Sequence, residues 1–325
     1  MTAARPKPYY QVVDGVPRSP LIAPELLREG FEFVPEKGDL LQVSYPKSGT
    51  HWVQYITQLI LRNGEPLESY EDFRKNAVFL EYRPGPRSYR PSNVLRTFLT
   101  HIPLHTENMN PEAKYVYVAR NPWDCCVSAY HHAKDVSVYL FEDGTFDDFF
   151  ECFLEGDFGW GDYFEHVVGG YSLKNEPNVF FVTYEELKTN TRNTIVNLAR
   201  FIGDRYGNML ENDGKDGQKL LDIIIERSAP ESMRNILASN LGGQGNVDAD
   251  ESLKKLDISS KVSHGGSKSH SFVRRGEVGG WKEYFSPDQL RRMEAIIAKK
   301  THGSNVMSLW CDIREEALRI CGESE

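Results

Sequence analysis

Short apolar runs alternate with stretches of helical periodicity along most of the chain. Residues 39–45, DLLQVSY, form a nearly continuous apolar run, which is typical of a strand buried on both faces. Apolar residues then recur at helical spacing over residues 50–64, and Gly64 is suited to end this helix. The same patterns predict strands over residues 93–101 and 114–120, and a strand within residues 178–187 that ends near Tyr184. They also predict helices over residues 192–203 and from Pro287 onward.

Polar residues stand at the ends of the predicted strands. Strands that alternate with helices form a parallel sheet with helices on both faces, and ligands bind outside the carboxyl ends of such strands. Lys47, His101, Arg120 and Tyr184 each lie at or just beyond a strand end. We therefore predict an α/β fold with a central parallel sheet flanked by helices, and a site at this edge of the sheet.

The length and composition fit one large domain. With 325 residues, of which 40% are hydrophobic, the chain can bury a substantial core, and we predict a single domain over residues 1–325. Residues 1–38 are rich in proline and are expected to form an N-terminal arm that packs on the rest. Residues 240–280 are rich in Gly and Ser and long for a connection, which favours a flexible loop that contacts cofactor or substrate.

The charge balance restricts the partners. A formal net charge of −9 disfavours nucleic acid and anionic membranes, so any anion must bind in a local basic pocket. No segment approaches the roughly 20 apolar residues of a membrane span, and the N-terminus lacks the apolar region of a signal peptide. The five cysteines lack a C-x-x-C spacing, which favours reduced thiols. We predict a cytoplasmic protein without a nucleic-acid or membrane partner.

Residues 45–52, YPKSGTHW, join the first strand of the sheet to the helix that follows. A helix N-terminus presents free backbone N–H groups and the positive end of the helix dipole. Gly49 allows close approach of a phosphate, Ser48 and Thr50 add hydroxyl groups, and Lys47 adds a positive charge. The lysine precedes the glycine, unlike in the G-x-x-x-x-G-K-[ST] loop of nucleotide hydrolases. The alternative is an ordinary buried turn with a surface lysine.

His101 follows the strand TFLT and is a candidate general base, because histidine titrates near neutral pH. Spacing alone does not choose between His101 and His105, His131 or His132. A purely structural role for His101 is the other alternative.

Arg120 and Ser128 are expected at the start and two turns along a helix that begins near Pro122. An arginine and a serine in these positions can share one phosphate, and the alternative is that Arg120 pairs with Asp124. A second phosphate-binding candidate is the basic turn of Arg274, Arg275 and Gly276, which could also be a solvated turn. No metal-binding pattern occurs, and we predict no metal.

Five motifs in this order resemble those of the cytosolic sulfotransferases, from about residue 30 to about residue 300. The motifs are YPKSGTHW, THIP, YVARNPWDCCVSAYHH, VTYEEL and FVRRGEVGGWKEYF. Each is weak alone, but the ordered set is highly specific. The resemblance implies the donor 3′-phosphoadenosine 5′-phosphosulfate (PAPS), which leaves as PAP, and a small acceptor with a hydroxyl or amine group.

The resemblance also implies roles for individual residues. His101 is the catalytic base, and Lys47 stabilises the charge on the bridging oxygen that stays with the nucleotide. Arg120, Ser128, Arg274, Arg275 and Gly276 hold the 3′-phosphate. The residues expected around the 5′-phosphosulfate and the adenine are Lys47, Ser48, Gly49, Thr50, His51, Trp52, Tyr184 and Ser228.

The sequence departs from the family pattern at several positions. His51 stands where a second threonine is usual, Leu99 replaces a common lysine, Pro230 occupies an aromatic position, and Gly280 replaces an acid. Residues 282–291, KEYFSPDQLR, do not match the family's dimer motif K-x-x-x-T-V-x-x-x-E, so both a monomer and a homodimer are open.

The acceptor pocket is expected to include Pro46, Phe79 and His132, with Tyr82 and Tyr139 nearby. Aromatic walls suit a planar phenol, and Asp135 is a candidate partner for the ammonium of a phenolic monoamine. Two other functions compete with sulfuryl transfer. One is a small-molecule kinase, which would need magnesium and ATP; the other is a non-catalytic binder of phosphoadenosine nucleotides or phenols.

Overall fold

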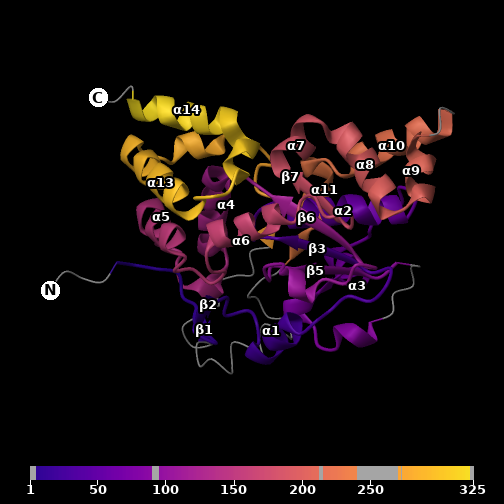
Figure 1. The fold of residues 1–325 in the computed structure, drawn as a ribbon, viewed down its shortest axis with the longest axis horizontal. Helices are drawn as coiled ribbons and strands as arrows, with labels where there is room; N and C mark the ends of the chain where they lie inside the picture. The colour runs from indigo at the N-terminus through magenta and orange to yellow at the C-terminus, as the bar shows by residue number, and fades with distance from the viewer. Residues whose placement is uncertain (1–4, 90–94, 212–214, 240–269, 272, 323–325) are drawn as a thin grey trace.

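The predicted strands lie in one parallel sheet at the centre of the molecule (Figure 1). The computed structural model describes residues 5–89, 95–211, 215–239, 270–271 and 273–322. The strand order is β4–β5–β3–β6–β7, and every neighbouring pair is parallel. The strands span Val78–Phe79 (β4), Thr97–Thr100 (β5), Leu40–Ser44 (β3), Lys114–Ala119 (β6) and Val179–Thr183 (β7). The four predicted strands are confirmed, whereas the two residues of β4 carry no recognisable period and were not predicted.

Helices cover both faces of this sheet (Figure 1). Their bounds are Pro24–Phe31 (α1), Thr50–Leu61 (α2), Tyr70–Asn76 (α3), Pro122–Asp135 (α4), Phe146–Glu155 (α5), Tyr163–Ser172 (α6), Tyr184–Thr189 (α7), Thr191–Ile202 (α8), Asp204–Glu211 (α9), Lys215–Arg227 (α10), Pro230–Ile236 (α11), Pro287–Lys300 (α13) and Cys311–Gly322 (α14). Short antiparallel pairs join Gln11–Val13 (β1) to Val16–Arg18 (β2) and Ala238–Ser239 (β8) to His270–Ser271 (β9). Within the described ranges, no helix has the length and apolar character that crossing a bilayer requires.

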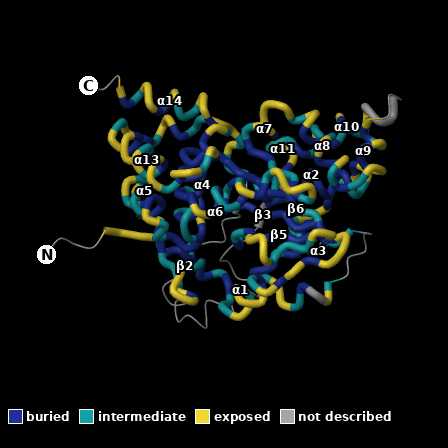
Figure 2. Tube along the Cα trace, viewed as in Figure 1, coloured by how far each residue is buried: buried dark blue, intermediate teal, exposed yellow. Residues whose placement is uncertain are grey.

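The period of two along each strand sends alternate side chains into two separate cores. Leu41 and Val43 of β3 belong to a cluster that includes residues of α4, α5, α6 and α13. Leu40 and Leu99 belong to the other cluster, which includes residues of α2, α8 and α9. The central strands are therefore buried on both faces, as the apolar runs predicted, and the exposed positions lie on the outer helices (Figure 2).

The N-terminal residues contribute to the larger core. The β1–β2 hairpin and α1 supply buried side chains, among them Val13, Ile22 and Leu27. The amide of Tyr9 donates to the carbonyl of Tyr139 at 2.6 Å. Of the loop predicted over residues 240–280, residues 240–269 and 272 lie outside the described part of the chain.

Candidate active site

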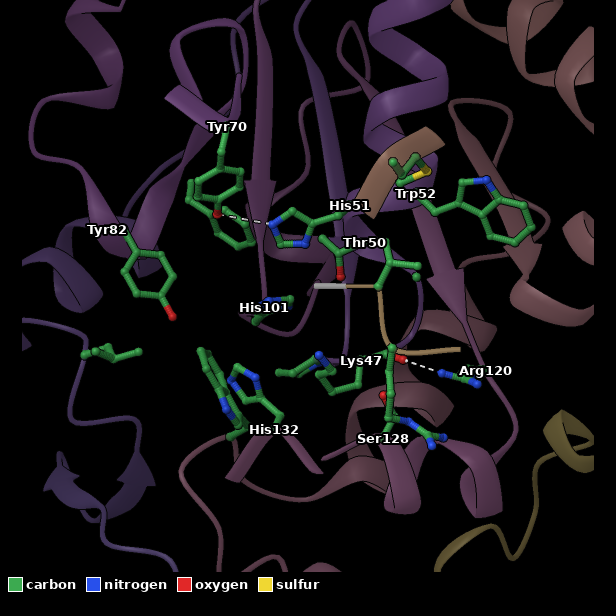
Figure 3. Close-up of a pocket in the computed structure, with 18 of the residues that line it drawn as sticks. Lys47, Thr50, His51, Trp52, Tyr70, Tyr82, His101, Arg120, Ser128 and His132 are labelled. Atoms are coloured by element: carbon green, nitrogen blue, oxygen red, sulfur yellow. Dashed lines mark hydrogen bonds between the residues drawn. The ribbon is translucent and has the colours of Figure 1, made fainter. Parts of the chain in front are cut away.

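A cavity of about 480 Å³ opens at the carboxyl edge of the sheet (Figure 3). Lys47 follows β3, His101 follows β5, Arg120 follows β6 and Tyr184 follows β7, and all four line the cavity. The predicted convergence of these strand ends is thus confirmed. It arises because neighbouring parallel strands end at the same edge.

Most of the other residues expected at a site are in the same lining. They are Pro46, Gly49, Thr50, His51, Trp52, Phe79, Ser128, His132, Arg274, Arg275 and Gly276. Ser48 and Ser228 are buried outside it: the Ser48 hydroxyl lies 4.0 Å from the Cys125 thiol, and the Ser228 hydroxyl donates to the Ile225 carbonyl at 3.2 Å. These two side chains are therefore already engaged with the protein.

Side chains of strand β3 form hydrogen bonds with the start of helix α2 and so hold the loop between them. The Gln42 side-chain amide donates to the Thr50 carbonyl at 2.7 Å, and the hydroxyls of Ser44 and Thr50 lie 2.7 Å apart. Lys47 has a φ of 71°, a left-handed conformation that is uncommon for a residue with a Cβ. The strand thus fixes the first turn of α2, and the lysine is held in the lining.

Gly49 combines a conformational and a steric requirement. Its φ is 104°, and a Cβ at this position would lie 2.9 Å from the ring of Tyr184. We expect Gly49→Ala to lower the free energy of unfolding by about 1–3 kcal/mol and to weaken PAP binding, because the loop must shift. Denaturant unfolding and calorimetry with PAP measure both effects.

Gly15 offers a matched control for Gly49. Its φ is +81°, but a Cβ there would meet nothing within 4 Å. Gly15→Ala should therefore carry the backbone strain alone and leave PAP affinity unchanged. Equal PAP affinities of the Gly49 variant and the unmodified protein would contradict a tight fit between this loop and its ligand.

Three cations line the cavity without a counter-ion. Among the described residues, no carboxylate lies within ion-pair distance of Lys47, Arg120 or Arg274. Burial, together with the nearby Arg120, lowers the pKa of Lys47 to about 8. Burial also lowers the pKa of Arg274, and Arg120 acts in the same direction. The protein therefore holds positive charges that repel one another, an arrangement that a bound polyanion relieves.

Asp124 does not neutralise Arg120, so that alternative is wrong. The Arg120 guanidinium instead donates to the carbonyls of Lys47 at 3.2 Å and Glu277 at 3.0 Å. The Asp124 carboxylate accepts the backbone N–H groups of Gly279 at 2.8 Å and Trp281 at 3.1 Å. It thereby ties the segment that carries Arg274 to the start of α4.

Arg274 and Arg275 are adjacent in sequence but differ in burial and in ion pairing. Arg274 is partly buried in the lining and has no carboxylate within ion-pair distance among the described residues. Arg275 is exposed and pairs with Glu283 at 2.8 Å. Only Arg274 offers an uncompensated charge to a ligand.

Buried polar atoms without partners also point to a ligand in the cavity. Arg120 Nε and Trp52 Nε1 are buried and have no hydrogen-bond partner among the described residues. The Arg120 guanidinium stacks on the Tyr184 ring at 4.4 Å, and Trp52 packs against the same ring at 5.1 Å. Buried donors of this kind are normally satisfied, so an anion beside aromatic rings fits the residues present.

His101 is held with one ring nitrogen directed at the protein. Its Nδ1 lies 2.7 Å from the Ser44 carbonyl, which only accepts, so Nδ1 carries the proton and Nε2 presents a lone pair. Burial lowers the pKa of His101 to about 4. The imidazole is therefore a neutral base at physiological pH. Of the competing histidines, His131 bonds to Tyr284 and His105 is exposed, and neither lines the cavity.

Glu81 supports His101 and was not found from the sequence. Its buried carboxylate accepts the backbone N–H of His101 and the hydroxyl of Thr100. Burial raises the pKa of Glu81 to about 7. No motif signalled this residue, because its role depends on the contact between β5 and the turn after β4.

The part of the cavity around His101 is largely apolar and aromatic. Trp160 packs edge-on against the His101 ring at 5.0 Å, and Phe79 lies 5.1 Å from that ring. Tyr139 is not in the lining; its hydroxyl accepts the Trp160 indole N–H at 3.2 Å. Further lining residues that the sequence did not indicate are Leu21, Ala23, Glu25, Leu26, Tyr70, Arg74, Pro84 and Trp160.

Two of the departures from the family pattern have structural consequences. Leu99 is fully buried in the cluster that contains Val53 and Ile56, so it faces away from the cavity. Pro230 is in the lining, and a Cβ on Gly276 would lie 2.7 Å from its ring. The Gly276 turn therefore packs directly on the start of α11.

The protein is an α/β protein with a central parallel sheet. At the carboxyl edge of this sheet, the loop that contains Gly49 borders a cavity lined by cations, an arrangement suited to binding phosphate groups. Residues 37–305 match the family model described as "Sulfotransferase domain". The chain belongs to this family, and it is a sulfotransferase. Within the described residues, no group of three or more His, Cys, Asp or Glu side chains is arranged to hold a metal ion.

Curated relatives match over nearly their whole length. Sulfotransferase 1C2 of Oryctolagus cuniculus is 29% identical over 90% of this chain and 93% of its own. Amine sulfotransferase of the same species is 30% identical over 91% of both chains. The 3-alpha-hydroxysteroid sulfotransferase of Cavia porcellus is 28% identical over 88% of this chain and 92% of its own.

Solved structures share the fold. Mouse sulfotransferase SULT7A1 complexed with PAP aligns with a TM-score of 0.66 and 23% identity, over 94% of this chain and 99% of that one. Retinol dehydratase in complex with androsterone and inactive cofactor PAP aligns with a TM-score of 0.63 and 22% identity, over 87% of each chain.

Proposed function

We propose that the protein transfers a sulfuryl group from PAPS to the hydroxyl or amine of a small acceptor, most readily a phenol. One observation carries the proposal: three cations that form no ion pair with a described residue, and a helix N-terminus, line the same cavity as His101, whose Nε2 has no hydrogen-bond partner in the described part of the chain. PAPS supplies the sulfuryl group and two separated phosphates, and its product PAP is present in two solved structures of the same fold.

The nucleotide would be held at two places. Lys47, the backbone of Gly49 and Thr50, and the N-terminus of α2 suit the 5′-phosphosulfate. Arg120, Ser128 and Arg274 suit the 3′-phosphate, and this contact distinguishes PAPS from nucleotides that lack the group. Trp52 and Tyr184 offer aromatic faces to the adenine.

His101 and Lys47 have different roles in the transfer: His101 accepts a proton, and Lys47 stabilises the leaving group. Nε2 of His101 accepts the acceptor's proton as the acceptor oxygen forms its bond to sulfur. Lys47 stabilises the negative charge on the bridging oxygen, which keeps the electron pair of the broken sulfur–oxygen bond and remains on PAP. The Ser44 carbonyl holds the imidazole in the productive tautomer throughout.

The acceptor side favours a planar compound. Phe79 and Trp160 flank His101, and Pro46, Tyr82 and His132 extend the lining. Aromatic walls of this kind suit a phenol ring. The similarity to an amine sulfotransferase supports an amine group on the acceptor, and a phenolic monoamine combines this group with a planar ring.

The carboxylate that would pair with an acceptor ammonium is better supplied by Glu25 than by Asp135. Asp135 is exposed at the end of α4 and is not in the lining. Glu25 lines the cavity from the first turn of α1 and has no ion-pair partner among the described residues.

An acceptor panel tests the proposed function. The protein is incubated with PAPS and matched pairs of phenols with and without an amine, such as tyramine and 4-ethylphenol, and with steroids and aliphatic alcohols. We expect sulfated phenols to form. PAP binding with no product from any acceptor would favour a non-catalytic binder, and ATP-dependent phosphorylation that needs magnesium would favour a kinase.

The pH dependence of kcat/KM follows from Lys47 and His101. With the pKa of His101 near 4, the base is neutral above that pH, and activity rises as pH increases through it. With the pKa of Lys47 near 8, its positive charge, and with it the activity, is lost as pH rises further. Lys47→Arg should remove the alkaline limb, because arginine stays protonated. An unchanged alkaline limb in this variant would assign the limb to another group.

A further inference from the structure

His101 lies just beyond the end of β5, where strand pairing no longer fixes the main chain. The register between β3 and β5 ends at the pair of Val43 and Thr100, so His101 lies outside it. Buried backbone groups that leave a sheet need other partners, and side chains can supply them. The His101 N–H donates to the Glu81 carboxylate, and the His101 ring is held at Nδ1 by the Ser44 carbonyl at 2.7 Å.

A third contact to His101 comes from His166, a buried residue of α6 that is outside the cavity lining. Nε2 of His166 lies 3.2 Å from the main-chain carbonyl oxygen of His101. Because a carbonyl only accepts, this hydrogen bond requires a proton on Nε2 of His166. Burial lowers the pKa of His166 to about 3, so the ring is neutral and carries this single proton.

Two tyrosines hold the His166 ring. Tyr45 packs edge-on against it with centroids 5.7 Å apart, and Tyr117 lies at the same distance with an interplanar angle of 44°. The Tyr117 hydroxyl lies 2.7 Å from His166 Nδ1 and 2.8 Å from the His166 carbonyl oxygen. A neutral ring protonated on Nε2 has a lone pair on Nδ1, which this hydroxyl can satisfy. The imidazole therefore bridges Tyr117 and the main chain of His101.

We propose that His166 is a positioning residue, whose Nε2–H fixes the main chain of His101 and thereby the direction of the His101 base. The inference rests on the proposed function. His101 is then held at its N–H, its carbonyl and its ring by three segments that are distant in sequence. His166 lies outside the lining and acts only through His101. Such support matters because a displacement of about 1 Å at a reacting group can cost about 10²-fold in rate.

Two amide substitutions form a matched pair. His166→Gln places a side-chain N–H near the position of Nε2 and can still donate to the His101 carbonyl. His166→Asn ends near the position of Nδ1, so it keeps a polar partner for Tyr117 and loses the donor to His101. We expect His166→Asn to lower kcat for a phenol about 10- to 100-fold, and His166→Gln to retain clearly more activity. Equal kcat in the two variants, or an unchanged kcat in His166→Asn, would overturn the proposal.

The His101→Ala background separates positioning from general damage. If His166 acts through the imidazole of His101, adding His166→Asn should change the residual kcat of His101→Ala by less than about twofold. Calorimetry should likewise give His166→Asn a PAP affinity within about twofold of the unmodified protein, because the proposed phosphate contacts do not include His166. An equal fall in kcat in both backgrounds, or a matching loss of PAP affinity, would show a structural effect and overturn the proposal.

Nuclear magnetic resonance keeps the test decisive if the variants fail to fold, and it does not depend on turnover. In unmodified protein with nitrogen-labelled histidine, the shifts of the ring nitrogens show which of them carries a proton. We expect His166 to be protonated on Nε2 and His101 on Nδ1 at neutral pH. A His166 ring without a proton on Nε2 would overturn the proposal. Failure of the unmodified protein to sulfate any acceptor, with these tautomers in place, would instead reject the proposed function.

Discussion

His101→Ala is expected to reduce kcat by a factor of about 10²–10⁴, the usual contribution of a positioned general base, and to leave PAP affinity nearly unchanged. The reason lies in the geometry of the ring. Nδ1 is fixed on the Ser44 carbonyl, so Nε2 is the group that can take the acceptor's proton. PAP carries no acceptor, and its binding does not use Nε2. Steady-state rates with a phenol and calorimetry with PAP measure the two quantities separately.

Two further variants distinguish loss of the base from a structural effect of the substitution. His101→Asn keeps a side-chain N–H near the position of Nδ1, where it can still donate to Ser44, but has no group at Nε2. It should be as inactive as the alanine variant. His105→Ala changes an exposed histidine outside the lining and should retain full activity. Substantial turnover by His101→Asn would show that another group accepts the proton.

Arg120→Ala is expected to weaken PAP binding by about 2 kcal/mol or more, which is about 30-fold, because a buried charge-assisted contact to a phosphate is lost. The loss should be specific. Adenosine 5′-phosphate, which lacks the 3′-phosphate, should lose much less affinity for the variant than PAP does. Isothermal calorimetry with both nucleotides gives the difference directly.

Arg120 also holds the carbonyls of Lys47 and Glu277, so part of its effect is structural. The adjacent arginines Arg274 and Arg275 provide the cleaner comparison. Arg274→Ala removes a charge in the lining that forms no ion pair among the described residues, and Arg275→Ala removes one that is exposed and paired with Glu283. We expect Arg274→Ala to cost more PAP affinity than Arg275→Ala. Equal losses would contradict the assignment of the 3′-phosphate to the inner arginine.

The edge of the sheet that carries the site could be predicted because its signals are local. Each of the four predicted strands has four to six residues, and each is followed by a polar residue that the parallel arrangement brings to one edge. The loop around Gly49 combines a positive φ with a close approach to Tyr184, two requirements that favour glycine. The order of the motifs gave the family, which the match over residues 37–305 confirms.

The parts that could not be predicted depend on contacts between distant segments. Leu21 and Leu26 come from the N-terminal residues, yet they line the cavity beside His101. Trp160 follows no motif, and its position depends on a hydrogen bond to Tyr139. Asp124 was considered as a partner for Arg120, but it binds backbone amides of a segment more than 150 residues away. The spacing of residues along the chain does not predict contacts between such distant segments.

We expect this chain to move a sulfuryl group from PAPS to a small acceptor, with His101 as the base. The most direct measurement follows sulfur-labelled PAPS and 4-ethylphenol in the presence of EDTA, with adenosine 5′-phosphosulfate as the comparison donor. The unmodified protein should give labelled 4-ethylphenyl sulfate and stoichiometric PAP. The rate should be much lower with adenosine 5′-phosphosulfate as donor, and His101→Asn should form almost no labelled product. Label transfer that is equally fast with both donors, or that survives in His101→Asn, would contradict this expectation.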